Sequence, residues 1–199
     1  MKASICNNRG AVYVGIIFIL LTVLLLSTSL LNMSIDSMGM VINSNNDSYR
    51  ANYIIESILE LKIEEIMELF DGAIRNYMAD LQTYKVEHSE DIDGFSYGLP
   101  DFYSYIRGLD SDITGLSESA KNPFGEYKEK HYYKVDIKCD WDKKRVNITS
   151  RGEYKQARKF INVELELPTV TNEGEDENGL PKIAILPARI TRYYQTYGL

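Results

Sequence analysis

The side chains that most often bind metals or transfer protons are few in this sequence and widely spaced. The two histidines, His88 and His131, are far apart and have no Cys or Asp at the spacing of a metal site. His131 opens a predicted strand, so both are interpreted as surface or strand-edge residues. Cys6 precedes an apolar segment, and Cys139 lies on the apolar side of a predicted strand, where we expect it to be a core residue. No disulfide is expected between them.

Two acidic runs could in principle bind calcium. The run "DSDITG" (110–115) begins like a calcium loop, but Lys121 stands where such a loop needs a glutamate. The run "EGEDEN" (173–178) is dense in carboxylates, and a solvated acidic loop is the better interpretation. No nucleophile elbow, phosphate-binding loop or paired carboxylates are found. We therefore expect no catalytic residue, no metal and no cofactor, and a protein that is not an enzyme.

Positive charge is concentrated between residues 143 and 159, where Glu153 is the only carboxylate. The whole chain carries −7, which argues against general nucleic-acid binding. If the ends of the predicted hairpins cluster, the cations form a basic patch. The patch would pair with an acidic face of a neighbouring chain; DNA or host-surface anions are a less favoured partner, and protection of edge strands from aggregation is a third explanation. The predicted patch consists of Lys143, Lys144, Arg145, Arg151, Lys155, Arg158 and Lys159.

An apolar segment, residues 11–31, contains no charged residue and no histidine. At about 1.5 Å per residue, a helix of this length spans roughly 30 Å, the thickness of the hydrocarbon core of a bilayer. Lys2 and Arg9 precede the segment and Asp36 follows it. The positive-inside rule therefore predicts a single-pass plasma-membrane protein with a cytoplasmic N-terminus and an extracytoplasmic C-terminal domain.

The helical pattern continues beyond this segment, over residues 32–82. No proline occurs before Pro100, and apolar residues recur every three or four positions, with glutamates on the opposite side. The apolar stripe consists of Leu59, Ile63, Ile66, Phe70, Ala73, Tyr77 and Leu81. We therefore predict one long N-terminal helix whose first half is transmembrane and whose second half is amphipathic.

A globular domain is predicted over residues 83–199. Apolar and polar residues alternate near 131–141, 145–149 and 160–167, which indicates three half-buried antiparallel strands. The links "DKK" and "SRGEYKQARK" are polar and suit hairpin connections. Loops with short helical pieces are expected before the sheet, and one or two strands after it, interrupted at Pro187. The predicted fold class is α+β, with the helix stripe covering the apolar face of a small antiparallel sheet.

The first residues of the chain resemble a known family. A short basic leader that ends in Gly10, an apolar helix that starts at Ala11, and a helix packed on a small antiparallel sheet resemble a type IV prepilin. The segments "NSNNDSYRANYIIESILE" and "VNITSRGEYKQARKFINVELEL" are similar to minor pilins of the PilX type. The resemblance implies that residues 1–10 are a leader, that a prepilin peptidase cuts after Gly10, and that the new amine of Ala11 is methylated.

The resemblance also implies what becomes of the apolar helix. It would leave the membrane and pack in the core of a pilus against other pilins, with the globular domain facing outward. The residues expected to contact neighbouring helices are Ala11, Val14, Gly15, Ile17, Leu21 and Leu25.

Gly15 departs from the pattern of the major pilins, which carry a glutamate at the fifth mature residue. In the filament that carboxylate is thought to neutralise the terminal amine of a neighbour, and a buried charge without a partner costs several kcal/mol. The departure suggests a minor pilin that is tip-proximal or initiates assembly through the assembly platform. A pseudopilin of a secretion system and an uncleaved single-pass surface adhesin or receptor module remain as alternatives.

Overall fold

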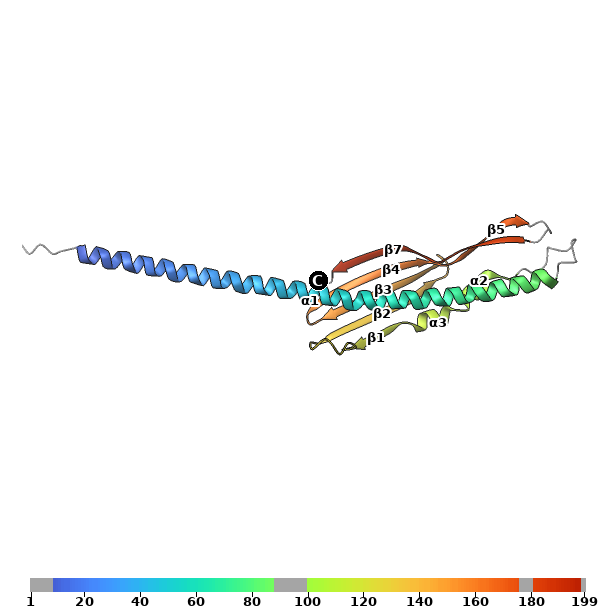
Figure 1. The fold of residues 1–199 in the computed structure, drawn as a ribbon, viewed down its shortest axis with the longest axis horizontal. Coiled ribbons are helices and arrows are strands. Elements are labelled where there is room, and N and C mark those ends of the chain that lie inside the picture. Colours follow the sequence, from blue (N-terminus) through green and yellow to red (C-terminus); the bar gives the residue numbers. More distant parts are fainter. Residues whose placement is uncertain (1–8, 88–99, 176–180, 198–199) are drawn as a thin grey trace, which may run out of the picture. The chain divides into compact units, whose positions relative to one another are not determined.

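The computed structural model describes residues 9–87, 100–175 and 181–197 (Figure 1). The chain forms two compact units, residues 1–46 and 47–199. Helix α1 (Arg9–Glu87) contributes to both, and it ends five residues beyond the predicted boundary at 82. The second unit adds an antiparallel sheet of five strands. The predicted α+β class, a long N-terminal helix packed on an antiparallel sheet, is confirmed.

The five-stranded sheet has the order β1-β2-β3-β4-β7, and every neighbouring pair is antiparallel. Its strands are β1 (Glu118–Lys121), β2 (His131–Asp140), β3 (Arg145–Tyr154), β4 (Ala157–Glu166) and β7 (Arg189–Tyr197). A separate two-stranded sheet pairs β5 (Thr169–Glu175) with β6 (Pro181–Leu186). Pro187 lies between β6 and β7, at the predicted interruption.

One sequence-based interpretation is wrong. The segment "SRGEYKQARK" is not a polar connection, because β3 continues to Tyr154 and β4 begins at Ala157. Tyr154 and Ala157 are register partners, so the connection is the two-residue turn Lys155–Gln156. Lys155 adopts a positive φ of 52°, which is the backbone conformation that tight hairpin turns require. The turn therefore depends on backbone geometry and carries no Gly, Asn or Asp as a sequence signal.

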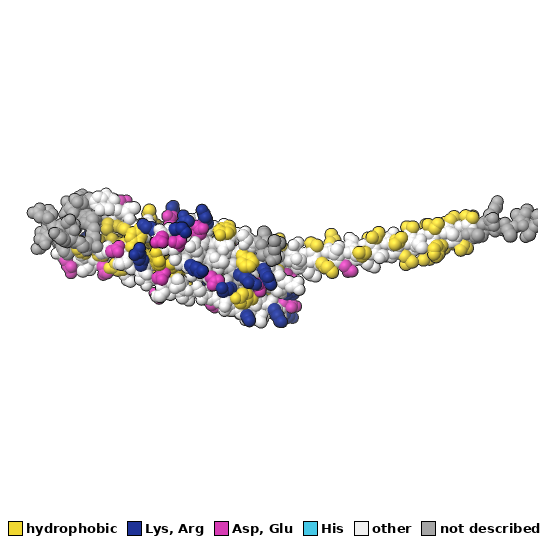
Figure 2. Space-filling model, turned by 180° about the vertical axis from the view of Figure 1, so that it is seen from behind, with side chains coloured by type: hydrophobic (Ala, Val, Ile, Leu, Met, Phe, Trp, Pro, Cys, Tyr) yellow, Lys and Arg dark blue, Asp and Glu magenta, His cyan; other side chains and the backbone are white. Residues whose placement is uncertain are grey.

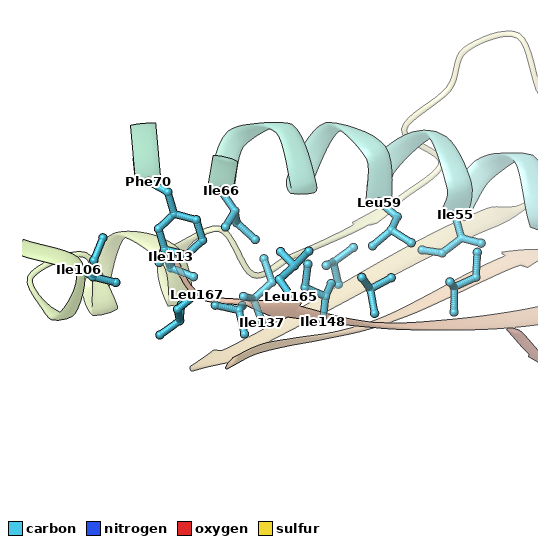
Figure 3. Close-up of a cluster of buried hydrophobic side chains, with 14 of the residues drawn as sticks. Ile55, Leu59, Ile66, Phe70, Ile106, Ile113, Ile137, Ile148, Leu165 and Leu167 are labelled. Carbon is cyan, nitrogen blue, oxygen red and sulfur yellow. The ribbon is translucent and has the colours of Figure 1, made fainter. Parts of the chain in front are cut away.

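The predicted stripe of α1 faces the core of the second unit. Each of its residues is buried except Ile63, which is half-buried. Figure 3 shows Ile55, Leu59 and Ile66 of α1 directed toward side chains of the sheet, among them Ile137 and Ile148. Burying a side chain of this size contributes about 1.5–3 kcal/mol, so this layer stabilises the unit substantially.

Two short helices extend the cover at one end of the sheet. They are α2 (Phe102–Arg107) and α3 (Asp110–Gly115), and they confirm the predicted helical pieces. Asp101 caps α2 by accepting a hydrogen bond from the backbone N–H of Tyr103. Phe102 is buried and meets Tyr77 of α1 edge to face, with ring centroids 5.0 Å apart. These helices close the end of the core that α1 alone leaves open.

Gly152 of β3 lies where α1 comes closest to the sheet. A Cβ at this position would be 2.5 Å from the carbonyl oxygen of Ala51 and 2.8 Å from Cβ of Ile55. Ala51 and Ile55 are themselves fully buried. The absence of a side chain at Gly152 therefore sets how closely the start of the buried stripe packs on β3.

Candidate functional site

The N-terminal part of α1 exposes a nearly continuous apolar surface. From Val12 to Ile42 its large hydrophobic residues are exposed on all sides of the helix, including Phe18 and Leu21. Figure 2 shows these yellow side chains along this part of α1. No charged residue occurs between Arg9 and Asp36. By length and composition, α1 can form a single membrane span.

The hydroxyl groups within this apolar part bond to the helix itself. Thr22 donates to the carbonyl of Ile19 at 2.8 Å, and Thr28 donates to that of Leu25 at 2.9 Å. Ser27 donates to the carbonyl of Val23 at 2.8 Å. Because lipid offers no hydrogen-bond partner, such internal bonds allow polar side chains to enter a bilayer or a bundle of apolar helices.

The predicted helix-packing residues lie on this exposed surface. Val14, Ile17, Leu21 and Leu25 follow one another at steps of three or four, so they share one face of α1, and all four are exposed. A Cβ added at Gly15 would meet nothing within 4 Å, so this glycine leaves a smooth patch beside that face. The arrangement leaves this stripe free to contact other helices or lipid.

The predicted cleavage site is only partly described. Gly10 and Ala11 belong to α1. Residues 1–8, with Lys2 and Cys6, lie outside the described residues. The leader and its cleavage therefore remain predictions from the sequence.

The seven predicted cations do not form one patch. Arg145 begins β3, and Lys155 immediately follows its end. Ten residues of strand at about 3.3 Å each separate the two ends by roughly 30 Å. Lys143, Lys144 and Arg145 therefore lie at one end of the sheet, and Arg151, Lys155, Arg158 and Lys159 lie toward the other. The expectation of a single basic patch is wrong because the connecting segment is extended strand.

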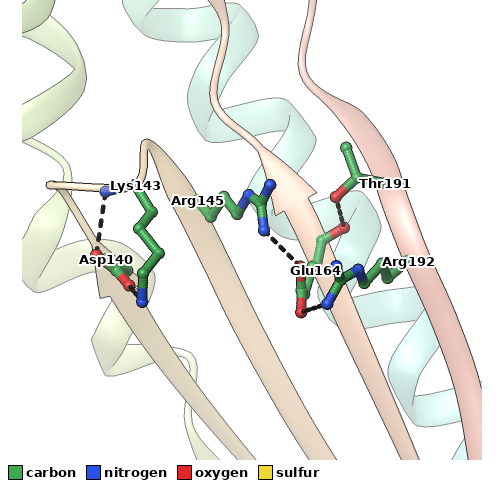
Figure 4. Close-up of polar contacts among 6 residues, drawn as sticks. All are labelled: Asp140, Lys143, Arg145, Glu164, Thr191 and Arg192. Carbon is green, nitrogen blue, oxygen red and sulfur yellow. Dashed lines mark hydrogen bonds and ion pairs between the residues drawn. The ribbon is translucent and has the colours of Figure 1, made fainter.

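Carboxylates pair with two of the three cations of the first group. Arg145 and Arg192 both contact Glu164, at 2.9 and 3.3 Å, and Lys143 contacts Asp140 at 3.1 Å (Figure 4). Lys143 holds the pKa of Asp140 below its usual value, chiefly through a side-chain hydrogen bond. Lys144 donates to the hydroxyl of Tyr103 at 2.6 Å. Acidic and basic side chains are also interleaved on the face seen in Figure 2. Lys144 therefore keeps its charge without a carboxylate partner among the contacts named, whereas Lys143 and Arg145 are paired.

A buried polar cluster was not predicted from the sequence. Lys62 is buried on the same side of α1 as the apolar stripe, and its Nζ lies 2.9 Å from Glu65 and 3.2 Å from Glu118. Glu118 also accepts a hydrogen bond of 2.6 Å from the hydroxyl of Tyr133. Lys62 follows Leu59 by three residues and precedes Ile66 by four, so its phase in the helix was a signal of burial.

The groups of this cluster shift one another's pKa values. Burial lowers the pKa of Lys62, but hydrogen bonds to Glu65 and Glu118 outweigh it, so the pKa lies above its usual value. The hydrogen bond from Tyr133, followed by that from Lys62, lowers the pKa of Glu118. Burial, together with Glu118, raises the pKa of Tyr133 to about 12. At neutral pH the cluster is a fixed ammonium–carboxylate–phenol network that ties α1 to β1 and β2.

The remaining candidates for chemistry have structural surroundings. The ring of His131 accepts from the N–H of Phe124 at 3.0 Å and lies 2.9 Å from the carbonyl of Glu129. Cys139 packs against the core, as predicted, and burial followed by a hydrogen bond to Asp110 raises its pKa to about 12. The run 110–115 forms α3. Within the described ranges, no group of three or more His, Cys, Asp or Glu residues is placed to hold a metal ion. The first three residues of the run 173–178 end strand β5 and do not form the loop expected there. His88 and residues 176–178 lie outside the described ranges.

The fold and the exposed apolar helix define an α+β protein with one potential membrane span. No protein-family model matches the chain, and no curated protein or solved structure matches it.

Proposed function

We propose that the chain is a minor pilin subunit, tip-proximal or assembly-initiating, of a type IV or competence-type pilus. In this proposal it enters the plasma membrane with its N-terminus in the cytoplasm, a prepilin peptidase cuts after Gly10, and the assembly platform transfers it into an extracellular pilus. The observation that carries the proposal is the contrast along α1. Its first part exposes apolar residues on all sides, whereas its second part is buried in a folded domain.

The chemistry of the apolar part supports a transfer between two apolar surroundings. A bundle of like helices and the interior of a bilayer both accept the side chains of Ile17, Leu21 and Leu25. No residue from position 12 to position 35 is charged, so no charged side chain has to move from the bilayer into the helix bundle. The hydroxyls of Thr22, Ser27 and Thr28 are already bonded within the helix. Moving the helix out of lipid therefore exposes no unpaired hydroxyl of these three residues.

Gly15 supports a special position in the pilus. Once the leader is removed, the amine of Ala11 is a new positive charge, and it needs a carboxylate wherever it is buried. No carboxylate occurs in this chain before Asp36, so it provides none at the fifth mature residue for the amine of a neighbour. Such a subunit fits the tip or the start of a filament, because a subunit at the end of the filament has a neighbour on one side only and need not pair with the amine of a second neighbour.

The mature N-terminus provides the test. We expect mass spectrometry of protein from cells with a prepilin peptidase to find a chain that begins at N-methyl-Ala11. The substitution Gly10→Gln is expected to leave the leader in place. The matched substitution Gly39→Gln, at a position of α1 with open space around it, is expected to leave cleavage unchanged. A functional protein that keeps residues 1–10 contradicts the proposal and favours a single-pass surface adhesin or receptor.

The abundance of the chain in sheared filaments tests its position. A tip-proximal or initiating subunit is expected at a small fraction of the bulk subunit, and Gly15→Glu is expected to increase its incorporation. Finding the chain as the bulk subunit contradicts a minor role. Finding it only in a secretion complex favours the pseudopilin alternative.

A further inference from the structure

A hollow of about 660 Å³ lies at one end of the second unit, close to Asp47. Four cations and one carboxylate, Glu153, line it. Two of the cations come from turns beside the sheet, one from the edge strand β1 and one from β3. The cations are Lys121, Lys130, Arg151 and Lys155. The hollow is built entirely from described residues of the second unit.

The strand register places these side chains together. Lys121 of β1 is the partner of Tyr132 in β2, and Tyr132 is the partner of Glu153 in β3. Because partners across antiparallel strands share a face, this row lies on the side of the sheet opposite α1. Arg151 is two residues before Glu153 and lies on the same face.

The turns that carry the other two cations are held side by side. The backbone N–H of Lys155 donates to the carbonyl of Lys130 at 2.9 Å. Asn122, at a positive φ of 52°, accepts from the N–H of His131 through its side chain at 3.0 Å. These bonds fix Lys130 and Lys155 at the rim, so the hollow does not depend on a loose loop.

The charges of the hollow are only partly paired. Lys155 lies 3.3 Å from Asp47, and Arg151 pairs with Glu153. Lys121 and Lys130 are exposed, and neither ammonium group contacts a carboxylate of the described residues. The Nε of Arg151 is buried without a hydrogen-bond acceptor in the part of the chain that the structure describes. That Nε is enclosed, so the groups of the hollow that an outside carboxylate can reach without rearrangement are the exposed ammonium groups of Lys121 and Lys130.

We propose that this hollow binds a short acidic polypeptide segment of a partner protein through its carboxylates. The two exposed lysines without a carboxylate partner match two carboxylates of such a segment, and the half-buried Tyr132 lines the hollow beside them. A nucleic acid fits less well. The whole chain carries −7, Glu153 lies inside the hollow, and the cations form one cluster instead of a stripe along a phosphate backbone.

The binding experiment uses the full chain in neutral detergent micelles. Labelled hexaglutamate is the probe, hexaglutamine is its uncharged match, and fluorescence anisotropy is measured at about 50 mM and about 200 mM salt. We expect hexaglutamate to bind about tenfold more tightly than hexaglutamine at the lower salt. The double variant K121Q/K130Q is expected to lose about three- to tenfold in affinity.

Two further variants decide whether the loss comes from the hollow. K138Q/K182Q removes the same charge from exposed lysines outside the hollow, and it is expected to bind within about twofold of the wild type. R151Q removes the guanidinium charge that lines the hollow, and it is expected to lose about threefold. Thermal unfolding of each variant checks that the fold is retained.

Three outcomes would overturn the proposal. One is a loss of affinity in K138Q/K182Q as large as that in K121Q/K130Q, which would show that hexaglutamate responds only to the overall charge of the protein. Another is no preference for hexaglutamate over hexaglutamine. The third is tighter binding of a random duplex DNA at the same salt, lost in K121Q/K130Q, which would make the hollow a nucleic-acid site.

Discussion

Phe18 and Phe70 lie on the same helix, α1, in opposite surroundings. Phe18 is 68% exposed in the first unit, whereas Phe70 is 1% exposed and packs in the core of the second. The large apolar side chains of α1 are exposed throughout the first unit, whereas most of those on the stripe in the second unit are buried. In the second unit a sheet and two short helices cover one stripe of α1, and charged side chains occupy its other side. In the first unit the large apolar side chains of α1 from Val12 to Ile42 are exposed, and by length and composition this part of the helix can span a membrane.

The largest effect is expected for matched phenylalanine substitutions. Phe70→Ala is expected to lower the free energy of unfolding of the second unit by about 3–5 kcal/mol, because it leaves a cavity in the core. Phe18→Ala is expected to change it by less than about 0.5 kcal/mol. Denaturant unfolding in micelles, followed by near-ultraviolet circular dichroism, measures both. A similar loss in both variants would contradict the division of α1 into a buried and an exposed part.

Two similarly exposed leucines, one in each part of α1, test whether only the first part enters a membrane. Leu21 is 52% exposed and Leu61 is 48% exposed, so exposure alone does not distinguish them. Leu21→Lys places a charge at the middle of the apolar segment, and it is expected to make insertion about 2.5–3.5 kcal/mol less favourable. Leu61→Lys is expected to leave insertion unchanged. Alkaline extraction of membranes measures the inserted fraction, and equal behaviour of the two variants would argue against a span at residues 11–31.

Two glycines in different surroundings are expected to respond with opposite signs. Gly152→Ala places a methyl group against the backbone of α1 and is expected to destabilise the second unit by about 1–3 kcal/mol. Gly72→Ala meets open space on a helix and is expected to stabilise it by about 0.5–1 kcal/mol. Thermal unfolding measures both. A tolerated Gly152→Ala would mean that α1 does not approach β3 as closely as described.

The smallest effect concerns the polar cluster on the buried side of α1. Tyr133→Phe removes the hydrogen bond to Glu118 and is expected to cost about 1 kcal/mol at neutral pH. The pKa of Tyr133 is raised to about 12, above its usual 10, so its contribution is complete below pH 10. That contribution is lost as the pH rises through 12.

Alkaline unfolding checks this sign. The free energy of unfolding of the wild type is expected to fall more steeply between pH 10 and about 12 than that of Tyr133→Phe. Tyr132→Phe, at the neighbouring position on the opposite face of the sheet, is expected to keep the wild-type slope. If the free energy of unfolding falls equally steeply with pH in the wild type and in Tyr133→Phe, the cluster does not raise the pKa of the Tyr133 phenol.

Periodicity explains which parts of the fold could be predicted. The stripe from Leu59 to Leu81 and the alternation in β2 and β4 report burial directly, because each side chain's direction follows from its position in the element. Gly152 could not be interpreted in this way. A glycine within a polar run indicates a turn, and only the approach of Ala51 and Ile55 shows that it is a packing position.

The candidate sites show the same limit. The cations of 143–159 are close in sequence, but β3 carries them to opposite ends of the sheet, where different carboxylates meet them. The hollow combines Lys121 and Lys130 with Arg151 and Lys155, which only the register of three strands brings together. Such a site depends on long-range pairing, and no local pattern indicates it.

Cross-linking from the exposed half of α1 tests the central claim most directly. A photoreactive benzoylphenylalanine replaces Leu21, and cells and sheared surface filaments are irradiated separately. The account predicts cross-links from position 21 to other filament subunits in the sheared fraction, and to lipid in the membrane fraction. Cross-links to lipid alone, with the protein absent from filaments, would contradict a helix that exchanges the bilayer for a bundle of other helices.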